Sequence, residues 1–197
     1  MLTKYLFVAI VAVVILQRLL EVRLSDRHRS EILQRGGTEH GDNLLGAVKI
    51  LQVSWWIAMI AEVWYVDRPF IPVLAAVALA ATIAGQILRY FSMQALTWRW
   101  TLPIMTLPNL PVVESGVYRY VRHPNWLGVI LEIAFLPLIH SAYITAIAFS
   151  VANAWLMNRR IATEEKALAE NTNYGAVFAN KPRFILTIGS MSPNTSQ

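Results

Sequence analysis

The sequence contains no cysteine among its 197 residues. That absence excludes disulfide frameworks, cysteine metal sites and thiol nucleophiles. Charged residues are also scarce, at 15% of the chain, against about 25% in an ordinary soluble domain. Apolar residues take their place and make up 56% of the chain. A soluble core of this size would leave much of that apolar surface in water, so the composition predicts an integral membrane protein.

The apolar residues fall into runs that can cross a bilayer. The predicted spans are about 5–22, 44–66, 70–90, 125–140 and 142–158. The last two share one run, Trp126–Met157, which as a single straight helix would overshoot about 30 Å of hydrocarbon. Pro137 and the pair His140-Ser141 near its midpoint therefore predict a tight hairpin of two short helices.

These spans define the predicted fold class, an all-α integral membrane protein with five transmembrane helices and a C-terminal helical hairpin. Residues 1–197 are expected to form a single domain, with a cytoplasmic helical extension over 159–186 and a tail over 187–197. The segment Thr97–Val113 is rich in aromatic residues and proline, so we expect it to be interfacial or re-entrant rather than spanning.

Basic residues give the predicted orientation. Five spans place 14 of the 17 lysines and arginines on one side of the membrane. Lys4 and Arg68 lie on the other side, and Lys49 lies within a span. The positive-inside rule then puts the N-terminus outside and the C-terminus in the cytoplasm, which in a bacterium means the inner membrane.

The net positive charge of the chain indicates membrane lipids as its partners. The formal net charge is +5, but no nucleic-acid-binding module is visible, and attraction to anionic headgroups explains the charge. The four histidines are widely scattered without ligand spacing, so no metal site is expected.

A short polar motif precedes the predicted hairpin on its basic side. It reads Arg122-His123-Pro124-Asn125-Trp126-Leu127-Gly128. Proline starts a helix well, and the free N–H groups of the first turn suit an anionic ligand group. Gly128 would let a flat ligand or another helix approach closely. The alternative interpretation is a loop whose arginines anchor at the headgroups.

A second polar segment follows the last span, where helix-forming residues predict that the last transmembrane helix continues to about Glu170. Arg160 and Glu164 are four residues apart and share a face. Without further evidence, these two residues indicate only a solvent-exposed helix with one ion pair. The adjacent Glu164 and Glu165 point about 100° apart, so one can face a pocket while the other faces water.

Together the two segments resemble the isoprenylcysteine carboxyl methyltransferase family, membrane enzymes that use S-adenosylmethionine. The family's arginine-histidine-proline signature, with its aromatic and glycine, is matched by Arg122, His123, Pro124, Trp126 and Gly128. Its arginine, paired glutamates and leucine after the last span are matched by Arg160, Glu164, Glu165 and Leu168. A tail pattern is matched by Tyr174 and residues 181–184, and the resemblance covers roughly residues 70–186. Trp126 stands where the family usually has tyrosine, so a hydroxyl contact there is lost.

The resemblance implies a cofactor site without a Rossmann fold, and the sequence indeed has no G-x-G-x-x-G motif. It implies S-adenosylmethionine as the cofactor, bound by Arg122, His123, Pro124, Trp126, Leu127, Gly128 and Glu165. Arg160 and Glu164 are the expected catalytic residues. An ionised carboxylate acceptor needs only the guanidinium of Arg160, whereas a hydroxyl acceptor must lose a proton, for which Glu164 is the candidate base.

A third polar segment lies at the end of the first predicted span, at about residues 17–41. It is similar to a bacterial branch of the family associated with methylating alkylpyrone or phenolic lipids. This favours a long-chain hydroxyl acceptor, with an isoprenylated cysteine or similar carboxylate as the alternative. The alternative is that this segment is purely structural. Arg18 and Glu21 then form an ion pair between helices, and Glu39 lies in a connecting loop. Other rivals are an NADPH-dependent sterol-type reductase, which shares a similar motif, and a membrane scaffold or small transporter.

Two polar residues lie within the apolar hairpin, where ionisable side chains are costly and often functional. Glu132 and Asn153 fall on antiparallel neighbours, so we expect them to bond each other.

Overall fold

The computed structural model describes residues 1–41, 44–108 and 110–184; the predicted tail over 187–197 lies outside this part of the chain. The described elements are, in order, α1 Leu2–Gln34, β1 Thr38–His40, α2 Leu44–Tyr65, α3 Pro72–Leu96, η1 Thr97–Arg99, β2 Ile104–Thr106, η2 Gly116–Arg119, α4 Pro124–Phe135, η3 Pro137–His140, α5 Tyr143–Asn171 and α6 Tyr174–Phe178.

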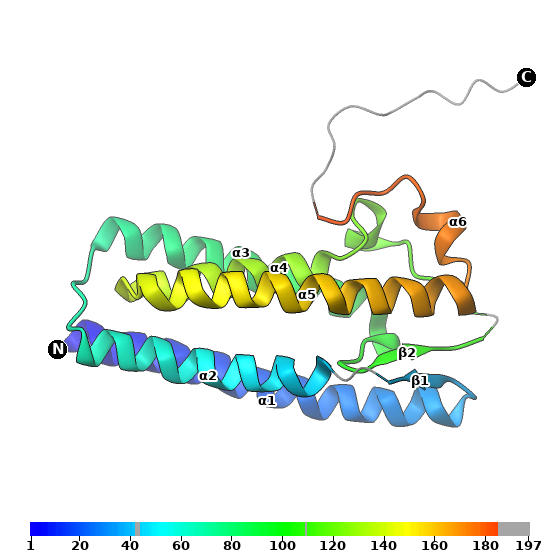
Figure 1. Ribbon diagram of the computed structural model, residues 1–197, viewed down its shortest axis with the longest axis horizontal. Helices are drawn as coiled ribbons and strands as arrows, with labels where there is room; N and C mark the ends of the chain where they lie inside the picture. The colour runs from blue at the N-terminus through cyan, green and yellow to red at the C-terminus, as the bar shows by residue number, and fades with distance from the viewer. Residues whose placement is uncertain (42–43, 109, 185–197) are drawn as a thin grey trace, which may run out of the picture.

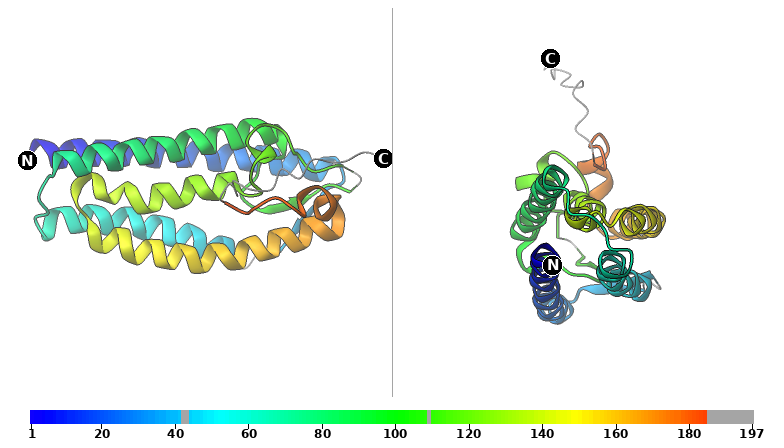
Figure 2. Two further views of the ribbon diagram at one scale, coloured as in Figure 1. Left: turned by 90° about the horizontal axis from the view of Figure 1, so that it is seen from above. Right: turned by 90° about the vertical axis from the view of Figure 1, so that its left-hand side faces the viewer.

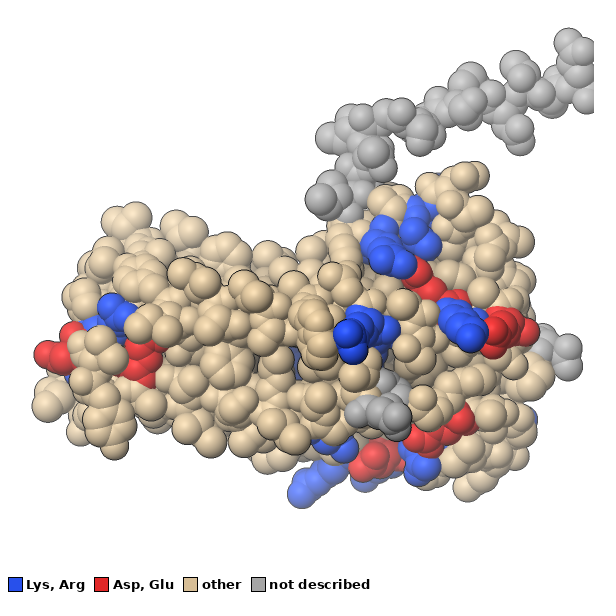
Figure 3. All heavy atoms as spheres, in the orientation of Figure 1, with Lys and Arg blue, Asp and Glu red and all other residues tan. Residues whose placement is uncertain are grey.

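The long helices lie side by side along one axis (Figures 1 and 2). Turns at the end that holds the N-terminus join α2 to α3 and η3 to α5 (Figure 1). The opposite end, here called the loop end, carries β1, β2, α6 and the connection over residues 97–123 (Figure 1). Charged side chains gather toward both ends of the face in Figure 3, and the surface between them is almost free of charge. An uncharged surface of this kind suits the hydrocarbon core of a bilayer, where charged side chains are costly.

Three helices of the described chain are long and apolar enough to cross a membrane: α1, α2 and the segment Pro72–Arg99. The other apolar helix, Pro124–His140, is shorter. The protein is thus a mostly helical membrane protein, and the count of five spans stays a prediction.

The hairpin between α4 and α5 is stabilised by two local features and one contact from α2. Pro137 begins η3, and Ser141 adopts a left-handed conformation with φ of 57° that reverses the chain. Glu62 of α2 then holds the start of α5, where its carboxylate accepts from the backbone N–H of Thr145 at 2.7 Å and of Ile144 at 3.1 Å. A carboxylate is favourable there because the first N–H groups of a helix lack partners within the helix.

The closest helix packing joins α3 to α4. A Cβ added to Gly128 would lie 2.5 Å from Cγ of Arg89 and 2.7 Å from the carbonyl oxygen of Gly85. The space beside each of these glycines is therefore filled by atoms of the neighbouring helix. Elsewhere in the bundle, apolar side chains such as Phe7, Trp55 and Leu136 are almost completely buried and form the core.

The loop end contains an element that the all-α prediction missed. β1 and β2 pair antiparallel, with Glu39 opposite Met105. This two-stranded ribbon ties the connection after α1 to the connection after α3. The expectation for Thr97–Val113 as a non-spanning segment agrees with its position at this end (Figure 1).

Candidate active site

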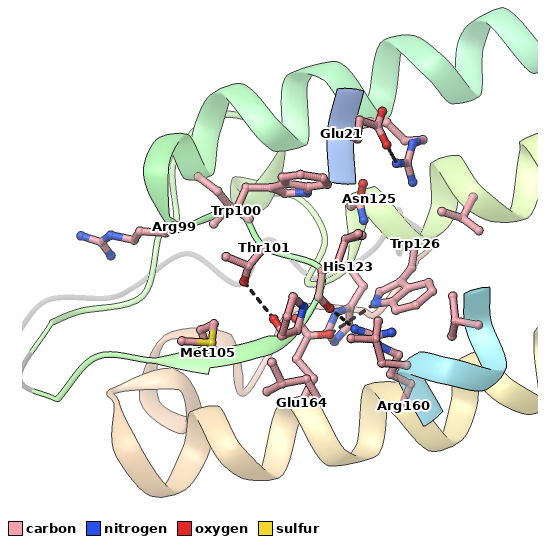
Figure 4. Close-up of a pocket in the computed structure, with 18 of the residues that line it drawn as sticks. Glu21, Arg99, Trp100, Thr101, Met105, His123, Asn125, Trp126, Arg160 and Glu164 are labelled. Atoms are coloured by element: carbon pink, nitrogen blue, oxygen red, sulfur yellow. Dashed lines mark hydrogen bonds and ion pairs between the residues drawn. The ribbon is translucent and has the colours of Figure 1, made fainter. Parts of the chain in front are cut away.

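A cavity of about 490 Å³ lies between the helices and continues under the loop end. Its volume falls within the range of about 300–1,000 Å³ that is typical of small-molecule sites. Helices α1 to α5 all contribute to its wall, together with residues 98–107 and 110–113 of the connection after α3. Figure 4 shows that Trp126, Arg160 and Glu164 converge on one part of this space, with Trp100 and Thr101 on the opposite wall.

The start of α4 forms one wall. Pro124 occupies the first turn, and His123 before it has an extended φ of −127°. The backbone N–H groups of Arg122 and His123 donate to the carbonyl oxygens of Pro182 at 3.0 Å and Arg183 at 3.1 Å. The chain after α6 therefore fixes the loop that carries the motif.

Glu165 of α5 lies among four side chains that can donate to it. Arg183 donates twice, from Nη2 to Oε2 at 2.6 Å and from Nε to Oε1 at 3.1 Å. His123 Nε2 lies 3.0 Å from Oε1, and Arg122 Nη1 lies 3.3 Å from it. The hydroxyl of Tyr174 donates to the same oxygen at 3.3 Å. We call these five residues the Glu165 cluster.

The charges of the cluster follow from these bonds. Burial alone would raise the pKa of Glu165, but hydrogen bonds from Arg183 and His123 outweigh it and hold this pKa below the ordinary 4.5. The hydrogen bond to Glu165 also raises the pKa of Arg183. Burial and the charge of Glu165 raise the pKa of Tyr174, so its phenol stays protonated and donates. One carboxylate thus faces two guanidinium groups, and the cluster carries surplus positive charge.

Glu164, the neighbour of Glu165, faces the cavity instead. The indole Nε1 of Trp126 donates to its Oε2 at 3.3 Å. The guanidinium of Arg160 lies 5.5 Å from the centre of the same indole ring, within cation–π range. Arg160 is buried, and its Nη2 donates to the carbonyl oxygen of Leu102 in the connection after α3.

The connection after α3 closes the cavity opposite α5. The backbone N–H of Leu102 donates to the hydroxyl of Ser25 at 2.8 Å. Nδ1 of His28 lies 2.7 Å from the carbonyl oxygen of Trp100. Both partners belong to the part of α1 beyond its apolar run, so that extension serves as a support for this wall.

Toward the middle of the bundle the cavity meets a buried group of charges from three helices. Arg18 of α1 donates to Glu21 on the same helix and to Glu132 of α4. Arg89 of α3 donates to Oε2 of Glu21 at 2.6 Å. We call these four residues the deep cluster; all of them line the cavity. The expected Arg18–Glu21 ion pair is present, but it lies within α1 rather than between helices. The expected bond between Glu132 and Asn153 is wrong because the charge of Arg18 takes Glu132 instead.

The predicted site residues divide into two groups in the structure. The cavity brings together Arg122, His123, Trp126, Arg160 and Glu164. Within the described chain, Pro124, Leu127, Gly128 and Glu165 are not part of its wall. Gly128 faces α3, and Glu165 reaches the cavity through its partners Arg122, His123 and Tyr174.

Several cavity residues were not predicted as site residues. Asn125 lies inside the motif and Tyr118 lies four residues before Arg122, and this closeness in sequence was the available signal. Asn153 and the stretch Trp100–Leu102 also line the cavity. No local pattern marks the latter, because only the folding of the connection onto α1 and α5 brings it there.

Comparison with known proteins connects this geometry to a family. The sequence profile of the isoprenylcysteine carboxyl methyltransferase (ICMT) family matches residues 76–170, which include the start of α4 and the α5 residues at the cavity. The uncharacterized protein YpbQ of Bacillus subtilis (strain 168) is 32% identical over 166 residues, covering 84% of this chain and 98% of YpbQ. An uncharacterized protein of Haemophilus influenzae is 28% identical over 153 residues, covering 77% and 88% of the two chains.

The chain belongs to the ICMT family. Membership implies a membrane methyltransferase, which agrees with the long apolar helices and with the uncharged middle of the face in Figure 3. It also implies a lipophilic substrate. The matched region contains both segments that carry the sequence resemblance, Arg122–Gly128 and Arg160–Leu168.

Proposed function

We propose that this ICMT-family protein is an S-adenosylmethionine-dependent O-methyltransferase that acts on the hydroxyl group of a long-chain pyrone or phenolic lipid. One observation carries the proposal: a single cavity joins Arg122 and His123 to Arg160 and Glu164 and continues between apolar helices. One cavity can therefore hold a polar cofactor and an apolar acceptor side by side.

The loop-end half of the cavity fits S-adenosylmethionine. Aromatic side chains of Trp100, Trp126 and Tyr174 line it and can cover a flat adenine ring. The surplus positive charge of the Glu165 cluster suits the carboxylate of a methionine moiety, through Arg122 and His123. We propose that Glu165 itself acts as a positioning residue, since its contacts are with these cationic side chains.

For methyl transfer, the protein needs mainly to align the two reactants and to exclude water. When bound, S-adenosylmethionine supplies a methyl group attached to a sulfonium. Glu164 can accept the proton that a hydroxyl acceptor loses as its oxygen attacks. Arg160, fixed by Leu102 and Trp126, can stabilise negative charge on that oxygen.

The acceptor tail has a route into the cavity between α1 and α2. Leu19 of α1 and Val53 of α2 line the cavity and are at the same time 54% and 51% exposed. Side chains with both properties mark an edge of the opening. If the helices span the membrane as predicted, with the loop end in the cytoplasm, this opening faces lipid and admits an alkyl chain laterally.

Carboxyl methylation of a prenylated cysteine is the second candidate, and the buried guanidinium of Arg160 at the cavity favours it. A fork of donors holds a carboxylate well, and no base is then needed.

The test is transfer of a radiolabelled methyl group from S-adenosylmethionine by the purified full-length protein. Three acceptors are offered: an alkyl hydroxypyrone, a pentadecylphenol and N-acetyl-S-farnesylcysteine. Label in an ether of either hydroxyl acceptor supports the proposal. Label only in a base-labile ester of the farnesylcysteine replaces it with the second candidate, and no transfer to any acceptor contradicts it.

A further inference from the structure

One carboxylate oxygen in the deep cluster, on Glu132, has no hydrogen-bond donor among the described residues. Glu132 is 2% exposed, and one of its carboxylate oxygens, Oε2, accepts from Arg18. Its other oxygen, Oε1, is buried and has no hydrogen-bond partner among the described residues. Leaving a buried charged acceptor unpaired is costly, so such an atom calls for an explanation.

Charge balance within the cluster does not supply that explanation. Two guanidinium groups, of Arg18 and Arg89, face two carboxylates, of Glu21 and Glu132. In Glu21 both oxygens are occupied, since Oε1 accepts from Gln17 at 3.1 Å and Oε2 accepts from both arginines. Glu132 differs from Glu21 in having an oxygen to spare.

Glu132 lies on the acceptor side of the cavity. Asn125, Val129 and Glu132 occupy positions i, i+4 and i+7 on one face of α4, and all three line the cavity. The face therefore runs from the motif that begins the helix inward to Glu132. A ligand that fills the loop-end half leaves Glu132 in the wall of the remaining part, which an acceptor would enter from the membrane.

We propose that Glu132 determines which acceptor head group the cavity takes. Its Oε1 accepts a hydrogen bond from the hydroxyl of a neutral phenolic head, and its negative charge, held in place by Arg18, repels a head that enters as a carboxylate. This inference rests on the proposed function and extends it, because it assigns the choice between hydroxyl and carboxylate acceptors to one side chain.

The direction of the preference follows from hydrogen-bonding roles. An ionised carboxylate only accepts, so it needs a proton donor from its partner. A phenol with a pKa of about 10 remains neutral at pH 7.5 and brings its own donor, whereas a fatty acid is ionised there. A hydrogen bond to a charged group contributes enough for a preference of about tenfold to hundredfold.

The experiment measures binding of pentadecylphenol and of hexadecanoate to full-length protein saturated with S-adenosylhomocysteine, at pH 7.5. In the wild type the phenol should bind at least about tenfold more tightly than the carboxylate. Equal affinities, or tighter binding of the carboxylate, overturn the inference. This comparison needs no variant, so it stands even if changes in the deep cluster impair folding.

Two matched variants then locate the effect. Glu132→Gln presents an amide donor in place of the free oxygen, and the phenol-to-carboxylate affinity ratio should fall by about tenfold. Glu21→Gln removes a negative charge from the same cluster but no free acceptor, so the ratio should fall by clearly less than in Glu132→Gln. An unchanged ratio in Glu132→Gln, or an equal fall in both variants, contradicts the role of Glu132.

The same samples separate this inference from the proposed function. Failure of the wild type to bind S-adenosylhomocysteine would count against the methyltransferase site itself. Binding of S-adenosylhomocysteine without any preference between the two lipids would leave that site in place and overturn only the role of Glu132.

Discussion

The indole nitrogen of Trp126 lies 3.3 Å from a carboxylate oxygen of Glu164, 38 residues further along the chain, and donates a hydrogen bond to it. The sequence predicted that tryptophan at this position loses a hydroxyl contact that family members with tyrosine could make. The structure shows that the indole supplies a donor of its own. The substitution therefore changes the donor at this position rather than removing it.

This contact makes Trp126 testable. Trp126→Phe keeps an aromatic face for Arg160 but removes the N–H, so Glu164 should lose its orientation. We expect kcat to fall by about tenfold, because a hydrogen bond to a charged group is lost. Trp126→Tyr, which restores an O–H donor, should recover part of the loss. A wild-type kcat in Trp126→Phe would show that the contact has no part in turnover.

Glu164 and Glu170 provide a matched pair on one helix. Glu164 lines the cavity, whereas Glu170 is exposed and its carboxylate lies 4.0 Å from the ammonium of Lys166. Glu164→Gln should lower kcat by about 100-fold or more with a hydroxyl acceptor, the scale of a lost general base, and leave the affinity for S-adenosylhomocysteine largely unchanged. Glu170→Gln should match the wild type in both measurements, made by initial rates and calorimetry. Equal kcat in the two variants would remove Glu164 from the reaction.

Gly128 tests whether the glycine of the motif serves packing. Its added Cβ would meet the backbone oxygen of Gly85 at 2.7 Å, and backbone cannot move aside cheaply. Gly128→Ala should destabilise the protein by about 1–3 kcal/mol, measured as a lower melting temperature in detergent. Gly46 of α2 has open space around it, so Gly46→Ala should leave the melting temperature unchanged or slightly higher. A normal melting temperature in Gly128→Ala, with weaker binding of S-adenosylhomocysteine, would instead favour a ligand-facing glycine.

The Glu165 cluster predicts a specific dependence of stability on pH. The pKa of Glu165 is lowered in the folded protein, so its stabilising contribution is complete above the ordinary value of 4.5 and is lost as pH falls through the folded pKa. At pH 7 the wild type should melt above Glu165→Gln by about 2–8 °C, since charged hydrogen bonds are weakened. The difference should shrink as the pH is lowered below 4.5. A difference that is constant down to pH 3, or that grows in acid, would contradict the sign of the shift.

The helical framework was largely accessible from the sequence because local patterns determine it. Apolar runs predicted the long helices, and Pro137 with His140-Ser141 predicted the break between α4 and α5 that the structure has at Pro137–Ala142. The ribbon of β1 and β2 was not accessible. Each strand has only three residues, too few for an alternating pattern, and the paired residues Glu39 and Met105 are far apart in the chain.

The candidate site was accessible only where its residues are clustered in the sequence. The motif at Arg122–Gly128 and the pair Glu164-Glu165 were identified. The 100° offset agrees with only Glu164 lining the cavity, but Glu165 lies among cationic side chains rather than in water. The partners of Glu132 could not be identified in this way. Arg18 lies 114 residues away, and only the packing of α1 against the hairpin decides that it, rather than Asn153, pairs with Glu132.

Calorimetry of the detergent-purified protein with S-adenosylhomocysteine, and separately with NADPH, shows which cofactor the cavity binds. We predict micromolar binding of S-adenosylhomocysteine, weakened by about tenfold or more in His123→Ala, and no binding of NADPH. Binding of NADPH without binding of S-adenosylhomocysteine would contradict the account and indicate a reductase.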